Sequence, residues 1–239
     1  MDRLEKMEEF KDSLESARAE GDQVAEAAAL HGIGRIYLTE KVYDAAEEFL
    51  SQCAQLCRES GQREGLAQTL IDLGDLALAQ EDAENAEKMF RESLLIYQDN
   101  DLSQGQARVM DRIADVTVAR GNLDEAINIS LDGLNLCRQS ADRIGAIYFL
   151  EKIIPLYKAK GAVADVEASY RELITFAEEL GDSERMAMGL AGLADVYERV
   201  EKPEEAVPYL EMAHDIYLRL GKETEAGFIR EHLEKMGDS

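Results

Sequence analysis

The sequence predicts an all-α solenoid of about five tandem helix–turn–helix repeats, and two observations lead to this prediction. The same residue types return every 40 residues along the 239-residue chain, and within each period apolar residues recur three and four positions apart. A fixed period of this size marks a repeat architecture, and the three-and-four spacing indicates amphipathic helices. The rows that carry the period are Gly21, Gly61, Gly181 and Gly221; Leu30, Leu70, Met110, Leu150 and Leu190; Ile33, Leu73, Ile113, Ile153 and Leu193; and Ala46, Ala86, Ala126, Val166 and Ala206.

Each repeat is expected to hold two short helices that pack side by side. In the first repeat, one apolar pattern covers residues 27–37 and a second covers 43–57, with a turn at Glu40-Lys41 between them. Helices this short are not stable alone in water, so neighbouring repeats must bury each other's apolar faces. We therefore expect a single domain over residues 1–239, with repeats at 21–60, 61–100, 101–140, 141–180 and 181–220.

The segments at both ends are interpreted as half repeats that cap the array. Residues 2–20 align with second helices only, and Lys6 stands where other repeats have Ala or Val. Residues 222–236 align with first helices only, with Arg230 and Glu234 at positions that are apolar or small elsewhere. Because terminal repeats need a polar outer face, the array is predicted to be complete as written.

Glycine and proline positions predict how the helices turn and bend. The glycines of the first row follow second helices, where a left-handed residue ends a helix most easily. Gly34 and Gly74 are expected to let the two helices of a repeat approach closely. Pro203 is expected to begin a helix, whereas Pro155 and Pro208 lie inside helices and predict local bends.

The chain is strongly acidic, with 50 Asp and Glu against 26 Lys and Arg and a formal net charge of −24. Such a surface repels phosphate backbones and anionic lipids, so nucleic acid and membranes are not expected as partners. It favours encounter with basic segments of other proteins, although the charge could also serve solubility alone. No apolar run approaches the ~18 residues of a membrane span and no secretory leader is recognisable, so a chain that starts naturally at residue 1 is expected in the cytoplasm.

Catalytic, metal and cofactor sites are not predicted. The three histidines fall in different repeats and lack a partner at a suggestive spacing. Cys53 and Cys57 lie one helical turn apart, but nothing nearby completes the four ligands of a structural zinc site. Cys57 and Cys137 share a register position with Tyr97, which indicates a packing role for the cysteines. The glycines are explained by turns and close packing, so no phosphate-binding loop is needed.

The rows also carry a known signature, which is Leu, then Leu-Gly and Tyr on the first helix, with Ala and Phe on the second. It reads here as Leu30, Ile33-Gly34, Tyr37, Ala46 and Leu50, and again as Leu70, Leu73-Gly74, Ala86 and Phe90. On these residues the chain resembles the tetratricopeptide repeat family, in the long-repeat variety of LGN/Pins-type scaffolds. The resemblance implies a right-handed superhelix whose first helices line a concave groove, and a groove that binds a peptide or partner segment without catalysis.

The resemblance also implies which residues face the groove. The positions that it assigns to partner binding are Arg35, Asp72, Asp75, Arg108, Asp111, Arg112, Asp115, Tyr148, Lys152 and Asp195. Arg108 and Arg112 lie one turn apart, and paired guanidinium groups suit a terminal carboxylate or an acidic side chain. The acids beside them could instead neutralise both arginines internally. The register that Asp75, Asp115 and Asp195 share forms an acidic column, which could face a basic partner or simply be a solvated helix face.

The sequence therefore predicts a non-catalytic adaptor that binds a protein segment in its groove. Two alternatives remain open. A structural protein that self-assembles through its end surfaces or a superhelix edge would carry the same repeats and would form homo-oligomers. A regulatory sensor, in which a small peptide changes the superhelix, is disfavoured because sensors of that kind usually carry an output domain, and uninterrupted repeats leave no room for one.

Overall fold

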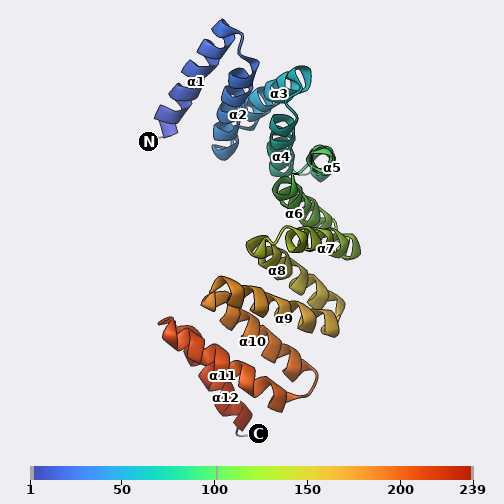
Figure 1. The fold of residues 1–239 in the computed structure, drawn as a ribbon, viewed down its shortest axis with the longest axis vertical. Coiled ribbons are helices and arrows are strands. Elements are labelled where there is room, and N and C mark those ends of the chain that lie inside the picture. Colours follow the sequence, from blue (N-terminus) through green and yellow to red (C-terminus); the bar gives the residue numbers. More distant parts are fainter. Residues whose placement is uncertain (1–2, 101, 238–239) are drawn as a thin grey trace. The chain divides into compact units, whose positions relative to one another are not determined.

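The computed structural model describes residues 3–100 and 102–237, which form twelve α-helices and no β-strand (Figure 1). Helices alternate with short turns throughout this part of the chain, so the predicted all-α repeat solenoid is confirmed. The helices of the first half are α1 (Arg3–Glu20), α2 (Gln23–Thr39), α3 (Tyr43–Ser60), α4 (Arg63–Ala79), α5 (Ala83–Asp99) and α6 (Ser103–Ala119). Those of the second half are α7 (Leu123–Gln139), α8 (Arg143–Lys160), α9 (Val163–Leu180), α10 (Ser183–Arg199), α11 (Pro203–Arg219) and α12 (Glu223–Gly237).

The chain divides into two compact units, an N-terminal unit of residues 1–122 and a C-terminal unit of residues 123–239. Within each unit every helix packs against the next, and α2 also packs against α4. The even-numbered helices are the first helices of the predicted repeats, and the odd-numbered helices are the second helices. The boundary between the units falls inside the predicted repeat 101–140, and the single domain over residues 1–239 stays a prediction.

A residue with left-handed backbone follows nearly every helix. The expected glycines confirm the prediction; Gly61, for example, has φ of 73° and ends α3. There the N–H of Gln62 donates to the carbonyl of Cys57 at 2.9 Å, which closes the helix end. Four residues other than glycine have the same conformation, namely Lys41, Glu81, Ala141 and Glu201, with φ between 55° and 65°, and each lies 40 or 80 residues from a glycine that ends a helix in the same register.

The small residues of the first helices lie directly against large residues of the second helices. A Cβ placed on Gly34 would lie 2.7 Å from Cγ of Leu50, and one on Gly74 would lie 2.4 Å from Cε1 of Phe90. Leu50 and Phe90 are fully buried, so each fills the space that its glycine leaves. The predicted close approach of the two helices in a repeat is therefore confirmed at these two positions.

The prolines lie in helices as the sequence predicts. Pro203 is the first residue of α11, and Pro208 lies inside the same helix. Helix α8 runs without a break through Pro155. Around it, Ile154 and Val166 are buried at positions that hold Gly or Ala in most other repeats, so this repeat packs with larger side chains. The local bends stay predictions.

The predicted end helices are present with small changes of bounds. Helix α1 begins at Arg3, and the predicted start at residue 2 lies outside the described residues. Helix α12 begins at Glu223 instead of residue 222. Lys6 and Glu234 are exposed, as a capping role requires, and the capping role itself stays a prediction.

None of the helices in the described ranges has both the length and the apolarity that a membrane crossing needs. Helix α8, at 18 residues, contains Glu151, Lys152, Lys158 and Lys160.

Candidate functional site

The predicted partner-binding residues all lie on first helices. In the N-terminal unit they are Arg35 on α2, Asp72 and Asp75 on α4, and Arg108, Asp111, Arg112 and Asp115 on α6. In the C-terminal unit they are Tyr148 and Lys152 on α8, and Asp195 on α10. In the N-terminal unit these residues are all charged, whereas those of the C-terminal unit include the aromatic Tyr148.

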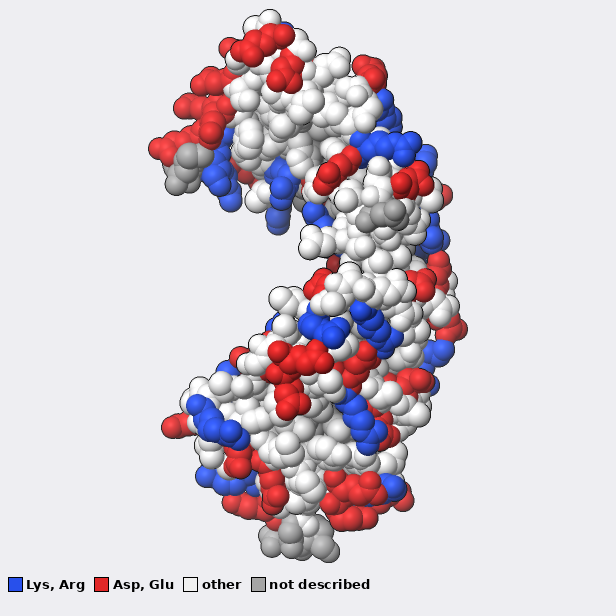
Figure 2. Space-filling model, in the orientation of Figure 1, with Lys and Arg blue, Asp and Glu red and all other residues white. Residues whose placement is uncertain are grey.

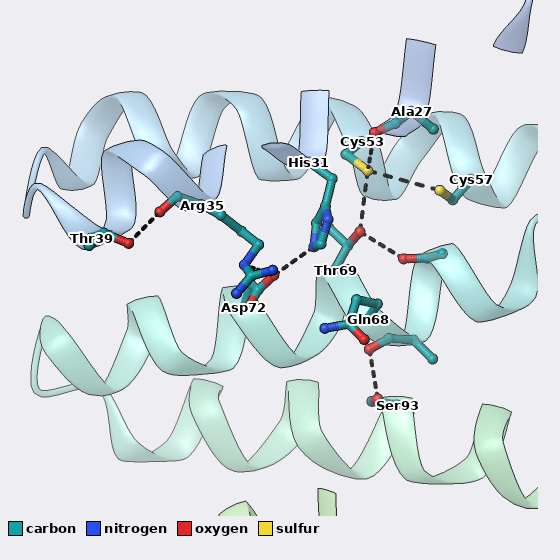
Figure 3. A network of polar contacts seen from close by, with 12 residues as sticks. Ala27, His31, Arg35, Thr39, Cys53, Cys57, Gln68, Thr69, Asp72 and Ser93 are labelled. Atoms are coloured by element: carbon teal, nitrogen blue, oxygen red, sulfur yellow. Dashed lines mark hydrogen bonds and ion pairs between the residues drawn. The ribbon is translucent and has the colours of Figure 1, made fainter. Parts of the chain in front are cut away.

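Asp72 is buried, with 4% of its surface exposed, and is held between two basic side chains of α2 (Figure 3). Nε2 of His31 lies 2.6 Å from Oδ2 of Asp72, and Nε of Arg35 lies 3.7 Å from the same oxygen. A carboxylate removed from water in this way needs such partners. Asp72 therefore joins α2 to α4 and presents no open face to a ligand.

Asp75 and Arg112 form the next contact, from α4 to α6, with Oδ1 and Nε 3.4 Å apart. Burial raises the pKa of Asp75, and the nearby Arg112 guanidinium partly counters that rise. Together with the Arg35–Asp72 pair, this geometry agrees with the internal neutralisation that the sequence left open. Arg112 is thus occupied at least in part within the protein.

Arg108 has a different environment from Arg112. Its guanidinium donates to the side-chain oxygen of Gln68 at 3.2 Å, which is a neutral acceptor. The exposed Arg108 side chain lines a hollow of about 460 Å³ between α4, α5 and α6, with Gln68, Tyr97 and Gly105 among the other lining residues. The charge of Arg108 also lowers the pKa of Asp75, with a smaller effect than that of Arg112. Asp111 is half-buried and Asp115 is exposed on the same helix.

The C-terminal unit exposes apolar side chains at one register position of its first helices. Tyr148 on α8 is 43% exposed, Met188 on α10 is 42% exposed, and Phe228 on α12 is 69% exposed. These residues are spaced 40 apart, whereas Ala28, Gln68 and Arg108 fill the same row in the N-terminal unit. Met188 is one of the positions that the family resemblance places on the groove, whereas Phe228 was not predicted as a site residue, although its 40-residue spacing from Met188 could have indicated it.

Charged residues beside this apolar row have partners within the protein. Nζ of Lys152 lies 5.1 Å from the centre of the Tyr148 ring, within reach of a cation–π contact. Glu151 accepts from Arg185 at 3.0 Å and joins α8 to α10. Figure 2 shows acidic and basic side chains lying side by side over much of the surface. The row of Tyr148, Met188 and Phe228 therefore offers a ligand apolar surface.

Asp195 is also engaged within the protein. It accepts from Lys158 at 3.0 Å and from Arg199 at 2.9 Å. Burial alone would raise the pKa of Asp195, but the hydrogen bonds from Arg199 and Lys158 lower it below its usual range. Of the predicted acidic column, Asp75 and Asp195 thus have basic partners inside their own units.

The three cysteines are free and buried. Burial raises the pKa of Cys57 to about 12 and that of Cys137 to about 11, and it also raises the pKa of Cys53. Thiols with such values stay protonated and unreactive near neutral pH. Cys53 donates to the carbonyl of Ala27 at 3.2 Å, and the cysteines occupy packing positions as expected (Figure 3). Within the described residues, no group of three or more His, Cys, Asp or Glu is arranged to hold a metal ion.

The tetratricopeptide repeat model matches residues 25–99 and 66–139. These overlapping stretches run from α2 to the end of α7, so the repeat resemblance is confirmed over that part of the chain. No finding bears on the LGN/Pins-type variety, which stays a prediction. No curated protein sequence matches the chain, and no catalytic family is shown.

Solved structures with the same fold cover between 81% and 97% of the chain at low identity. BtubC (BKLC) from P. vanneervenii is 14% identical with a TM-score of 0.73, covering 92% of this chain and 93% of its own. A putative kinesin light chain from Podosopora anserina with nearly identical TPR-like repeats is 16% identical with a TM-score of 0.62, covering 81% and 95%. A Rap protein complexed with Competence and Sporulation Factor is 13% identical with a TM-score of 0.62, covering 97% and 69%. At these identities the likeness shows the tetratricopeptide-like fold.

Proposed function

We propose that this protein is a non-catalytic scaffold that binds a segment of another protein along its first helices. The observation that carries the proposal is the exposed row of Tyr148 and Met188, one repeat apart on α8 and α10. Aromatic and Met side chains in water are typical of contact surfaces.

The spacing of the helices limits the ligand. Packed helices lie ~8–10 Å apart, and an extended chain advances ~3.3 Å per residue. An extended segment crossing α8 and α10 would therefore meet Tyr148 and Met188 with apolar residues about three positions apart. The net charge of −24 favours basic residues flanking that pair, because long-range attraction speeds encounter. Arg108, on its hollow in the N-terminal unit, suits a ligand carboxylate.

Two further points support a binding role over catalysis. The histidines lie on three different helices, and His31 and His232 each contact a carboxylate of the neighbouring first helix. This arrangement uses both histidines to join neighbouring first helices. Among the structures with the same fold, the Rap protein is complexed with Competence and Sporulation Factor.

The proposal is tested by capture of partners from native lysate, followed by quantitative mass spectrometry. The bait with Tyr148→Ser and Met188→Ser is compared with wild type and with a matched control, Met212→Ser and Leu218→Ser. The control residues are 47% and 51% exposed on the second helix α11. A protein captured by wild type and the control, but lost from the first-helix variant, supports the proposal. Identical capture by all three baits, or none beyond background by wild type, would refute it.

A second variant, Arg108→Glu, separates the contribution of the N-terminal unit. Loss of the same partner from this variant would show that the ligand carries a carboxylate to the α4–α6 hollow. Unchanged capture would restrict the contact to the C-terminal unit. Far-ultraviolet circular dichroism checks that every bait remains folded.

A further inference from the structure

A hollow of about 610 Å³ between α1 and α2 gathers basic side chains in this acidic protein. Arg3 and Lys6 line it from α1, and His31 and Arg35 line it from α2. Glu9 is the one acid among its lining residues. The apolar part of its wall includes Phe10, whose ring fills the space beside Gly32. The hollow therefore favours an acidic occupant with some apolar surface.

The repeat register says which element would fit the hollow. Helix α1 has the register of a second helix, and in the described residues no first helix precedes it. Helix α2, by contrast, packs against both its own second helix α3 and the next first helix α4. A first helix placed before α1 would have α1 and α2 as those two neighbours. The hollow lined by α1 and α2 is the place for such a helix.

Helix α12 is a first helix, and no second helix follows it in the described residues. Ala226 and Ile229 are buried on the side that packs with α11. Phe228, Glu231 and Glu234 are exposed, so acidic and apolar groups lie outside that contact.

We infer that α12 of a second copy of this chain occupies the hollow between α1 and α2. The two half repeats would then complete one repeat across two molecules. This inference goes beyond the proposed function, since a monomer could bind a partner segment equally well. The 40-residue register then predicts three contacts between α12 of one copy and α1 or α2 of the other.

The first contact joins Phe228 of one copy to Ala28 of the other. Gln68 and Arg108 hold the same register position on successive first helices, and their side chains meet at 3.2 Å. Phe228 and Ala28 hold that position on the two helices that would become successive. Ala28 lines the hollow, and the Phe228 ring is 69% exposed in the single molecule. The contact would bury an aromatic side chain that is otherwise in water.

The second contact joins Glu234 to Lys6. Glu234 holds the position of Gly34 and Gly74, which face the row of Leu50, Phe90 and, in α1, Phe10. Lys6 precedes Phe10 by one helical turn, so its ammonium group lies within reach of the Glu234 carboxylate. Larger side chains fit these two rows, because Ile154 and Val166 occupy them in another repeat and are both buried.

The third contact directs Glu231 toward α2 of the second copy. His31 and Glu151 hold the position of Glu231 on their helices, and each bonds a side chain of the next first helix. Arg35 of α2, whose Nε lies 3.7 Å from Oδ2 of Asp72, lines the hollow on that side and remains exposed. Acids on α12 thus meet bases in the hollow at two of the three contacts.

The hollow and the exposed face of α12 are different surfaces, and each molecule carries both. One molecule can therefore bind a second through its α12 and a third through its hollow, so that the contact can propagate beyond a dimer.

The test is a charge exchange read by sedimentation velocity and light scattering over a range of concentrations. Wild type is expected to associate as the protein concentration rises, at a salt concentration that screens the repulsion between two copies of net charge −24. Lys6→Glu or Glu234→Lys alone places like charges opposite each other, and each is expected to raise the dissociation constant about tenfold or more. The double variant Lys6→Glu with Glu234→Lys restores association, and so does an equimolar mixture of the two single variants. Lys11→Glu, with the same charge change at an exposed position of α1 outside the hollow, is the control.

Association of wild type with loss in both single variants, rescue by the exchange and no effect of Lys11→Glu would establish the contact. The inference is overturned if wild type stays monomeric up to millimolar concentration, if the double variant fails to associate, or if Lys11→Glu weakens association as much as Lys6→Glu. Circular dichroism confirms the fold of each variant, and rescue by exchange is itself unattainable for an unfolded chain. The lysate capture described above has an independent outcome, so the two proposals can fail separately.

Discussion

Nε2 of His31 lies 2.6 Å from Oδ2 of Asp72, and this contact ties the first helices of two successive repeats through a buried carboxylate. Further polar contacts between successive first helices join Asp75 to Arg112, Glu151 to Arg185, and Glu198 to His232. Repeat proteins depend on such contacts between neighbours, because no contact spans the whole array. Residues at predicted ligand positions therefore also take part in contacts between repeats.

Asp72→Ala is predicted to lower the free energy of unfolding by ~1–3 kcal/mol, because it leaves His31 without its partner and opens space beside it. Urea denaturation followed by circular dichroism measures the effect. Glu47→Ala, at an exposed position of α3, serves as the control and should stay within ~0.5 kcal/mol of wild type. Equal values for the two variants would show that the Asp72 contact contributes nothing.

Gly74→Ala and Gly227→Ala are predicted to act in opposite directions. A Cβ on Gly74 would lie 2.4 Å from the Phe90 ring, so overpacking should lower stability by ~1–3 kcal/mol. A Cβ on Gly227, inside α12, would meet nothing within 4 Å, so the better helix propensity of Ala should raise stability by ~0.5–1 kcal/mol. Thermal melts of both variants decide the matter, and a stabilising Gly74→Ala would contradict the packing described.

The periodic residues explain why so much of the fold was predictable. Gly34 and Gly74 are small because Leu50 and Phe90 lie against them, and a 40-residue spacing exposes that pairing in the sequence. Ala141 falls in the register of Gly21 and Gly61, so the period indicates the left-handed turn there although a methyl side chain carries no preference for it. There the helix-end hydrogen bonds decide the conformation against local preference.

Ala141→Gly should therefore stabilise the protein, by about 1 kcal/mol, because Gly removes the steric cost of positive φ. Gly61→Ala should destabilise it by a similar amount, since a Cβ there meets nothing within 4 Å and only the backbone is strained. The two changes can be compared by urea denaturation in one series. Destabilisation by Ala141→Gly would mean that the turn is not left-handed in solution.

The pH dependence of stability should differ in sign between two carboxylates of the N-terminal unit. Burial raises the folded-state pKa of Asp75, so its charge costs stability at neutral pH and the cost disappears as pH falls through the raised pKa. Asp75→Asn is thus expected to stabilise at pH 7 and to lose that advantage in acid.

Glu87 shows the reverse behaviour. A hydrogen bond from Arg91 lowers its folded-state pKa, with a further contribution from Arg120, so its charge stabilises the fold at neutral pH. Glu87→Gln should destabilise at pH 7, and the loss should vanish as pH falls through the lowered pKa. Urea midpoints from pH 7 to pH 3 test both variants, and parallel curves for the two would contradict these assignments.

The candidate site was less predictable than the fold. The sequence marks Asp72 as groove-facing, but the other residues of its row are Gly32, Arg112, Lys152, Gly192 and His232, and nothing in them indicates a buried carboxylate. Its burial depends on His31, one repeat away, and a contact that occurs only once has no period to reveal it.

The central claim is that a partner segment lies along the first helices of the C-terminal unit. The most direct test places a photo-crosslinking amino acid at Tyr148 in one preparation and at Leu218, on α11, in another, and identifies the cross-linked protein by mass spectrometry. We predict that one partner cross-links to position 148 and not to position 218. Cross-linking of that partner to position 218 alone would contradict the claim and would assign binding to the second helices.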